Sequence, residues 1–137
     1  MPSAEKALCD SGPLVALFDP RDTAHEVCLS CLQAFRGSLV TSWAVLTEAF
    51  HFLDQPRERE YLWEFISRDA LHVEDILPAE LPRLRSVMEK YADLPRDFAD
   101  ASLVVLAERL RLRKVFTLDR HFRLYRPRHV RAFEIIP

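Results

Sequence analysis

Short apolar runs alternate with longer segments of helical periodicity along the whole chain. Five runs are short, apolar and bounded by polar or turn-forming residues, which predicts strands at 7–10, 38–41, 70–73, 114–118 and 131–136. Apolar residues recur every three or four positions between them, which predicts helices over 12–18, 23–35, 43–53, 57–67, 81–91 and 97–110. This alternation favours an α/β fold with a central parallel sheet of about five strands, covered on both faces.

In the predicted helix 43–53, the spacing of apolar residues indicates which side chains face the core. Ser42 is suited to cap its first turn, because a serine oxygen accepts a hydrogen bond from a free backbone N–H. Trp43, Leu46, Phe50 and Leu53 follow at helical spacing. We therefore expect these four side chains to face the core.

Length and composition bound the class of protein. The 137 residues, 49% of them hydrophobic, are enough for one core, so we expect a single domain over 1–137. Charged residues make up 29%, and no apolar run approaches the roughly 20 residues of a membrane span. The N-terminal residues lack the pattern of a secretion signal. We expect a cytoplasmic protein without a membrane segment.

The cysteines do not predict a metal site by themselves. Cys28 and Cys31 form a C-x-x-C pair, but no second pair or nearby histidine completes a zinc site. Both lie at helical spacing with Leu32 and Phe35, which favours ordinary apolar packing. A redox role for the pair stays open.

Four acidic residues are the main candidates for chemistry: Asp10, Glu48, Asp100 and Asp119. Each lies in apolar or turn-forming surroundings, and they are spread over most of the chain. A structural role is available to each alone, since Asp10 and Asp119 could cap helices and Glu48 could be solvated. Together, carboxylates brought close would repel one another, and a divalent cation such as magnesium would relieve that repulsion.

Neighbouring residues extend this candidate site. Ser11 and Thr117 are suited to bind the carboxylates or a water from a second layer. Asp97 precedes Asp100 by three residues, so both point from the first turn of one helix. Whether Asp97 caps that helix or tunes a metal site stays open. Because ligands gather at the carboxyl ends of parallel strands, Asp10 and Asp119 are well placed.

Basic residues concentrate near the C-terminus although the net charge is −2. Nine lie between 109 and 131, where Asp119 is the only acid. Such a segment is suited to bind nucleic acid, but it could equally be a solvated face or contact an acidic protein segment.

Other catalytic patterns are absent from the sequence. The histidines show no H-E-x-x-H spacing, and there is no G-x-S-x-G, P-loop or G-x-G-x-x-G. A phosphoacceptor receiver is disfavoured because Asp10 has no acidic neighbour.

Four segments in order, 8–14, 42–49, 91–104 and 116–122, resemble the motifs of PIN-domain nucleases, in particular VapC-type toxins of bacterial toxin–antitoxin pairs. The resemblance covers almost the whole chain. It implies a three-layer α/β/α sandwich and endoribonuclease activity dependent on Mg²⁺ or Mn²⁺. By motif position, Asp10, Glu48, Asp100 and Asp119 would be the catalytic and metal-binding acids.

The resemblance also implies partners. It suggests a homodimer, an RNA substrate and neutralisation by a small antitoxin protein. Arg96, Arg120 and Arg123 are our candidates for contacts with RNA phosphates. The alternative function is a PIN-like module that binds RNA or protein without cutting.

Overall fold

A single parallel sheet organises the residues that the computed structural model describes, which are 5–94 and 97–137. Its strands are β1 (Glu5–Cys9), β2 (Gly37–Ser42), β3 (Leu71–Glu74), β4 (Lys114–Phe116) and β5 (Glu134–Ile136). They lie in the order β3-β2-β1-β4-β5, and every neighbouring pair is parallel. The predicted number and direction of the strands are confirmed.

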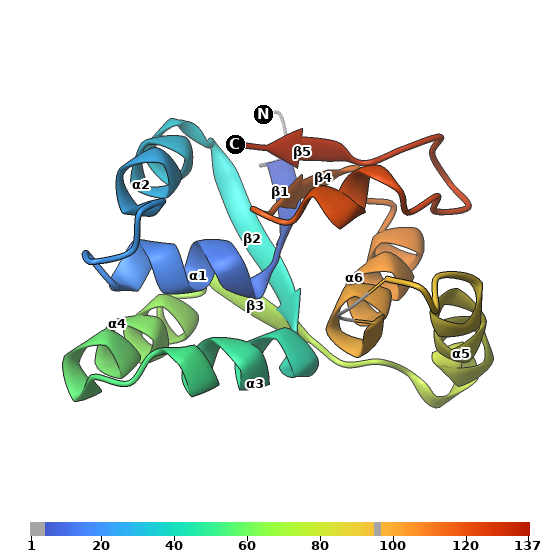
Figure 1. Cartoon of the computed structure of the whole chain (residues 1–137), viewed down its shortest axis with the longest axis horizontal. Helices are drawn as coiled ribbons and strands as arrows, with labels where there is room; N and C mark the ends of the chain where they lie inside the picture. Colours follow the sequence, from blue (N-terminus) through green and yellow to red (C-terminus); the bar gives the residue numbers. More distant parts are fainter. Residues whose placement is uncertain (1–4, 95–96) are drawn as a thin grey trace.

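Helices cover both faces of this sheet. They are α1 (Ser11–Phe18), α2 (His25–Ala34), α3 (Trp43–Phe52), α4 (Pro56–Ser67), α5 (Leu81–Lys90) and α6 (Asp97–Leu110), with 3-10 turns η1 (Pro78–Glu80) and η2 (Arg120–Arg123). Figure 1 shows α1, α2 and α4 on one side and α5 and α6 on the other. The expected three-layer α/β/α arrangement is confirmed.

The order of the strands creates a switch point between β1 and β4. From β1 the chain adds β2 and β3 on one side, and later adds β4 and β5 on the other. Cys9 pairs with Phe116, and the backbone N–H of Asp10 donates to the Phe116 carbonyl oxygen at 2.9 Å. The residues that follow β1 and β4 are therefore neighbours at the carboxyl edge of the sheet, where α/β proteins form their sites.

The core explains why this edge is rigid. The last three residues of β1 are inaccessible to solvent, and Leu103 and Leu106 of α6 are equally buried. Removing this apolar surface from water contributes about 25 cal/mol per Å². Strand β1 and helix α6, which present Asp10 and Asp100, are thus held by the best-packed part of the protein.

The structure corrects several details of the predicted elements. Strand β4 ends at Phe116, so Thr117 and Leu118 already belong to the loop, and β5 is limited to Glu134–Ile136. Trp43 was expected in the core but is 58% exposed. Its indole Nε1 donates to Asp75 Oδ1 at 2.6 Å, so the polar end of the ring has a partner at the surface.

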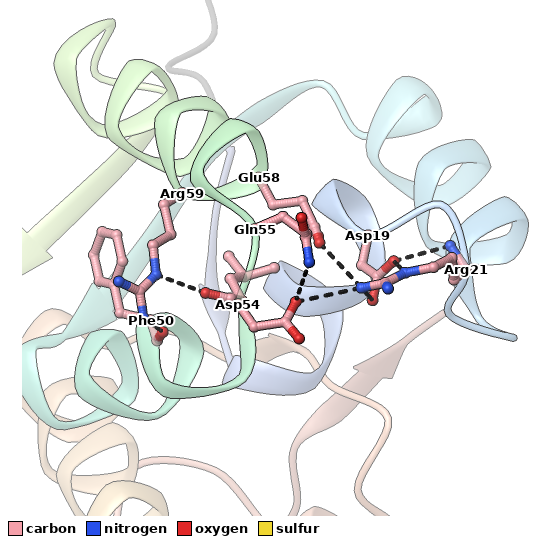
Figure 2. A network of polar contacts seen from close by, with 8 residues as sticks. Asp19, Arg21, Phe50, Asp54, Gln55, Glu58 and Arg59 are labelled. Carbon is pink, nitrogen blue, oxygen red and sulfur yellow. Dashed lines mark hydrogen bonds and ion pairs between the residues drawn. The ribbon is translucent and has the colours of Figure 1, made fainter.

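Polar contacts join the turn after α1 to the turn between α3 and α4 (Figure 2). The Arg21 guanidinium donates to Asp19 at 2.9 Å and reaches Asp54 and Glu58 at 3.4 Å. Arg59 donates to carbonyl oxygens at the end of α3, one of them at 2.6 Å. These contacts hold α1, α3 and α4 together on one side of the sheet.

Cys28 and Cys31 are free thiols on α2. Cys28 is inaccessible to solvent within the core, and Cys31 is partly buried against it. Burial raises the pKa of the Cys28 thiol to about 11. The prediction of apolar packing is confirmed.

Candidate metal centre

Three carboxylates from distant parts of the chain converge at the switch point. Asp10, Asp100 and Asp119 each offer an oxygen, and these oxygens lie within 4.8 Å of one another. Asp10 follows β1, Asp100 lies in the first turns of α6, and Asp119 lies in the loop after β4. The three elements that meet here therefore each contribute one acid.

Asp10 is fixed by both of its carboxylate oxygens. Oδ1 accepts the backbone N–H of Ser11 at 2.8 Å, so Asp10 caps α1, as one of the two interpretations expected. Oδ2 accepts the Thr117 hydroxyl at 2.8 Å. The same threonine oxygen accepts the backbone N–H of Asp119 at 3.0 Å. Thr117 thus links two of the three acids.

Asp100 is the most enclosed acid of the three, with 2% of its surface exposed. The Tyr125 hydroxyl donates to its Oδ2 at 2.9 Å. Ala99 and Ala101 flank it and are also buried, so small side chains leave room at this position. The positive end of the α6 dipole favours negative charge in this first part of the helix.

Asp119 has a capping role as well. It is the N-cap of η2, and its Oδ1 accepts the backbone N–H of His121 at 2.9 Å. It is less buried than the other two acids, so it lies at the open side of the cluster. Each acid that joins the cluster is therefore held by at least one hydrogen bond from the protein.

Glu48 lies beside the cluster on α3 and is connected to it through a serine. The Ser11 hydroxyl donates to Glu48 Oε1 at 3.0 Å, while the Ser11 backbone bonds to Asp10. The charge of Glu48 contributes to the electrostatic field on both Asp10 and Asp100. Ser11 therefore lies between Asp10 and Glu48 and bonds to both.

Burial and mutual repulsion raise the pKa values of the enclosed acids. Loss of hydration raises the pKa of Asp100 to about 8, and the charges of Asp10, Asp119 and Glu48 act in the same direction. The pKa of Asp10 is also raised, first by burial, although its bonds to Thr117 and Ser11 oppose this. The cluster therefore resists holding its full negative charge unless a cation accompanies it.

These residues fit a hard divalent cation. The cluster offers only carboxylate oxygens, which Mg²⁺ and Mn²⁺ prefer to nitrogen or sulfur. A cation would remove the repulsion that raises the two pKa values. Of the acids, Asp10, Asp100 and Asp119 are close enough to bind it together.

Two of the predicted phosphate-binding arginines flank the centre. Arg120 and Arg123 are exposed and line a pocket of about 160 Å³ together with Thr117 and Asp119. Arg96 lies outside the described residues. Helix α6 begins at Asp97, but the structure does not describe the side chain of this residue. Whether Asp97 caps the helix or tunes a metal site therefore stays open.

Some residues of the site were not identified from the sequence. Tyr125 holds Asp100, yet nothing distinguished it from the other apolar residues after β4. Ser42 caps α3 as predicted, but its hydroxyl also lies 2.7 Å from that of Ser102 on α6. Both contacts depend on side chains that meet only after folding, so spacing along the chain carries no signal for them.

Fold and site together define a class of protein. Residues 7–126 match the family described as PIN domain, and the chain belongs to this family. It is similar to ribonuclease VapC26 of Mycobacterium tuberculosis (strain ATCC 25618 / H37Rv), with 31% identity over 135 residues that cover 95% of this chain and 99% of the relative. The resemblance drawn from the four motifs is confirmed.

Solved structures agree on the fold. VapC20 of Mycobacterium tuberculosis, described as a toxin that cleaves the sarcin-ricin loop, superposes with a TM-score of 0.79 at 16% identity, covering 92% of this chain and 99% of that one. VapBC2 of Rickettsia felis, solved with a DNA fragment from its promoter, gives 0.63 at 15% identity, covering 96% and 99%. In the described part of the chain, no helix has the length and apolar character needed to cross a bilayer.

Proposed function

We propose that this protein is a metal-dependent endoribonuclease of the VapC type. The observation that carries the proposal is the convergence of Asp10, Asp100 and Asp119 at the switch point, with oxygens within 4.8 Å of one another. The similarity to ribonuclease VapC26 supports RNA as the substrate. A bound Mg²⁺ or Mn²⁺ would withdraw charge from the phosphodiester and make a water molecule a stronger nucleophile.

The protein's own side chains would divide the remaining work. Asp10 and Asp100 would be the main ligands of the cation, held in place by Thr117 and Tyr125 respectively. Asp119 would complete the site or hold a second ion. Glu48 Oε1 is engaged by a hydroxyl, which leaves Oε2 to orient the attacking water and accept its proton.

Arg120 and Arg123 would bind phosphates on either side of the scissile bond. Both are exposed next to Asp119, and an arginine fork matches two phosphate oxygens at once. Positive charge at this edge also offsets the repulsion between an acidic centre and a polyanion. Arg96, which lies outside the described residues, stays a candidate for the same role.

A cleavage assay tests the proposal directly. Purified protein is incubated with a panel of structured RNAs in MgCl₂, in MnCl₂ and in EDTA. We expect cleavage with either metal and none in EDTA, and the Asp100→Asn variant should lose nearly all activity while remaining folded. Full activity of this variant, or cleavage in EDTA, would contradict the assignment.

The alternative, a PIN-like module that binds without cutting, predicts another result. Such a protein would bind the RNA panel equally with and without metal and would cleave none of it. The intact set of acids disfavours this function, because crowded buried carboxylates cost stability and need a compensating use.

Two partners belong to the same proposal. Following the resemblance and the VapBC2 comparison, we expect a small antitoxin protein that suppresses cleavage and a homodimer of this chain. Light scattering on the purified protein would measure the mass of the assembly. Co-expression with the product of an adjacent small open reading frame would test suppression of toxicity.

A further inference from the structure

A second pocket, with a volume of about 510 Å³, lies along α6 and shares no lining residue with the acidic cluster. Four arginines and a histidine line it: Arg83, Arg109, Arg111, Arg128 and His129. Two glutamates and one valine complete the lining. Asp100 and Arg109 are nine positions apart on α6, which corresponds to about 13 Å along the helix axis.

Two of the arginines are already neutralised within the wall. Arg83 donates from Nε and Nη2 to the carboxylate of Glu108 at 2.9 and 2.8 Å. Arg109 donates from Nη1 to Glu80 Oε1 at 2.7 Å. All four side chains are largely buried, so these pairs build the pocket and hold its shape.

The other two arginines are exposed and unpaired. Within residues 5–94 and 97–137, the side chains of Arg111 and Arg128 form no ion pair and no hydrogen bond with another side chain. The backbone N–H of Arg128 donates to Glu108 at 2.8 Å, and the Arg128 charge helps to lower the pKa of that carboxyl group, although no side-chain bond joins the two. The pocket therefore carries an excess of two positive charges, since four arginines line it with two glutamates.

Arg111 also has an unusual backbone conformation. Its φ is +57°, in the left-handed region, and the N–H of Leu112 donates to the Ala107 carbonyl oxygen at 2.9 Å. This is the Schellman arrangement at a helix end, where glycine is the usual residue because a Cβ disfavours that conformation. An arginine at this position lowers helix stability, which makes its side chain a candidate for a role other than folding.

The histidine is held within the pocket wall. His129 Nε2 lies 2.7 Å from the Leu112 carbonyl oxygen, so this nitrogen carries the proton. Its Nδ1 is shielded from solvent and has no partner in the described part of the chain. His129 therefore forms part of the pocket wall, where its ring bonds to the segment that follows α6.

We propose that this pocket binds phosphate groups of the RNA chain a few nucleotides from the cleavage site, through Arg111 and Arg128. This rests on the proposed ribonuclease function. An acidic protein segment is the competing occupant. Peptide sites generally need apolar anchors, and here one buried valine is the only apolar side chain in the lining. A pocket lined mainly by arginine side chains is suited to a nucleic-acid backbone.

The test compares two double variants in the Asp100→Asn background, which keeps the RNA intact. One carries Arg111→Gly and Arg128→Gln. The control carries Arg36→Gln and Arg68→Gln, which removes the same charge from two exposed arginines that do not line the pocket. Fluorescence anisotropy measures binding of a labelled 20-nucleotide single-stranded RNA of mixed sequence, in EDTA, between 50 and 200 mM KCl.

We expect the pocket variant to bind at least tenfold more weakly at the lowest salt. The slope of log affinity against log salt should fall by about 1.4, because each lost phosphate contact accounts for about 0.7. The control should change affinity less than twofold. The Arg111→Gly change should keep or raise the Tm by about 3 °C, since it removes the left-handed Cβ.

Three results would overturn the proposal. The first is equal RNA affinity and slope for the pocket variant and its control, and the second is no RNA binding by the Asp100→Asn parent. The third is unchanged RNA affinity combined with lost binding of a 12-residue polyglutamate peptide, which would assign the pocket to an acidic protein. If the protein with its acids intact cuts no RNA but binding still needs Arg111 and Arg128, the ribonuclease function fails and the pocket stands.

Discussion

Replacing Asp100 by asparagine tests whether the centre is an electrostatically strained metal site. Asp100 is almost completely enclosed and lies against Asp10 and Asp119. Asparagine has nearly the same shape, and its carbonyl oxygen still accepts the hydrogen bond from Tyr125. The substitution therefore removes a charge and leaves the packing in place.

The expected magnitude follows from the pKa of this carboxyl group. It is about 8 in the folded protein, against 3.8 for the unperturbed side chain. Because the folded state holds the proton more tightly, this contribution to stability is fully present below about pH 4 and is lost as pH rises to about 8. Each pKa unit corresponds to 1.36 kcal/mol, so by pH 7 the loss is ~4 kcal/mol.

The asparagine variant lacks this titration. In EDTA at pH 7 to 8 we expect Asp100→Asn to be more stable than the unmodified protein by up to ~4 kcal/mol, while near pH 4 the two converge. Adding Mn²⁺ should stabilise the unmodified protein, by about 2.7 kcal/mol at a concentration 100 times the Kd, and the variant much less. Asp100 would thus be needed for cleavage and would at the same time lower the stability of the metal-free protein.

Urea unfolding followed by tryptophan fluorescence, between pH 4 and 8.5, measures both effects. Asp93→Asn is the matched control, since Asp93 is exposed and outside the cluster. The reasoning is refuted if the unmodified protein keeps constant stability across this range in EDTA. It is also refuted if Asp100→Asn unfolds at lower urea than the unmodified protein at pH 8.

Three further substitutions test the supports of the site, each by urea unfolding. Tyr125→Phe removes the hydroxyl that donates to Asp100 and should cost about 1–2 kcal/mol, and no loss would contradict that contact. Leu103→Ala opens a cavity beneath the same helix and should cost about 2–5 kcal/mol. Gly37→Ala should destabilise by more than ~2 kcal/mol, because its new Cβ would overlap the carbonyl oxygen of Glu5 in the neighbouring strand. An alanine variant as stable as the unmodified protein would refute this packing.

The strands and their direction could be predicted because the information is local. Runs such as 7–10 are apolar on both faces, and only a sheet covered by helices buries such runs. Sites in such folds lie at the carboxyl ends of the strands, and this rule predicted that Asp10 and Asp119 lie at the same edge of the sheet. The ends of β4 and β5 were overestimated, since an apolar residue such as Leu118 can follow a strand without pairing in it.

Other parts of the site depend on which side chains meet after folding. Trp43 fits the helical pattern of a core residue, yet a single acceptor, Asp75, stabilises it at the surface. Glu48 was grouped with the other acids, but its connection to them runs through Ser11. The spacing of a sequence defines which face of a helix a residue occupies, and it does not define what lies opposite that face.

Helix α6 explains how an acidic protein can act on a polyanion. Its first turns carry Asp100 into a centre that repels phosphate, and its last turns lead to a pocket with two free arginines. The middle of the helix is buried in the core, and about 13 Å of it separates the two sites. A cation would neutralise the first site and salt would screen the second. Variants of the acidic cluster should therefore lose metal-dependent cleavage and keep salt-dependent RNA binding. Variants of the arginine pocket should lose part of the salt-dependent binding and keep the metal dependence of cleavage.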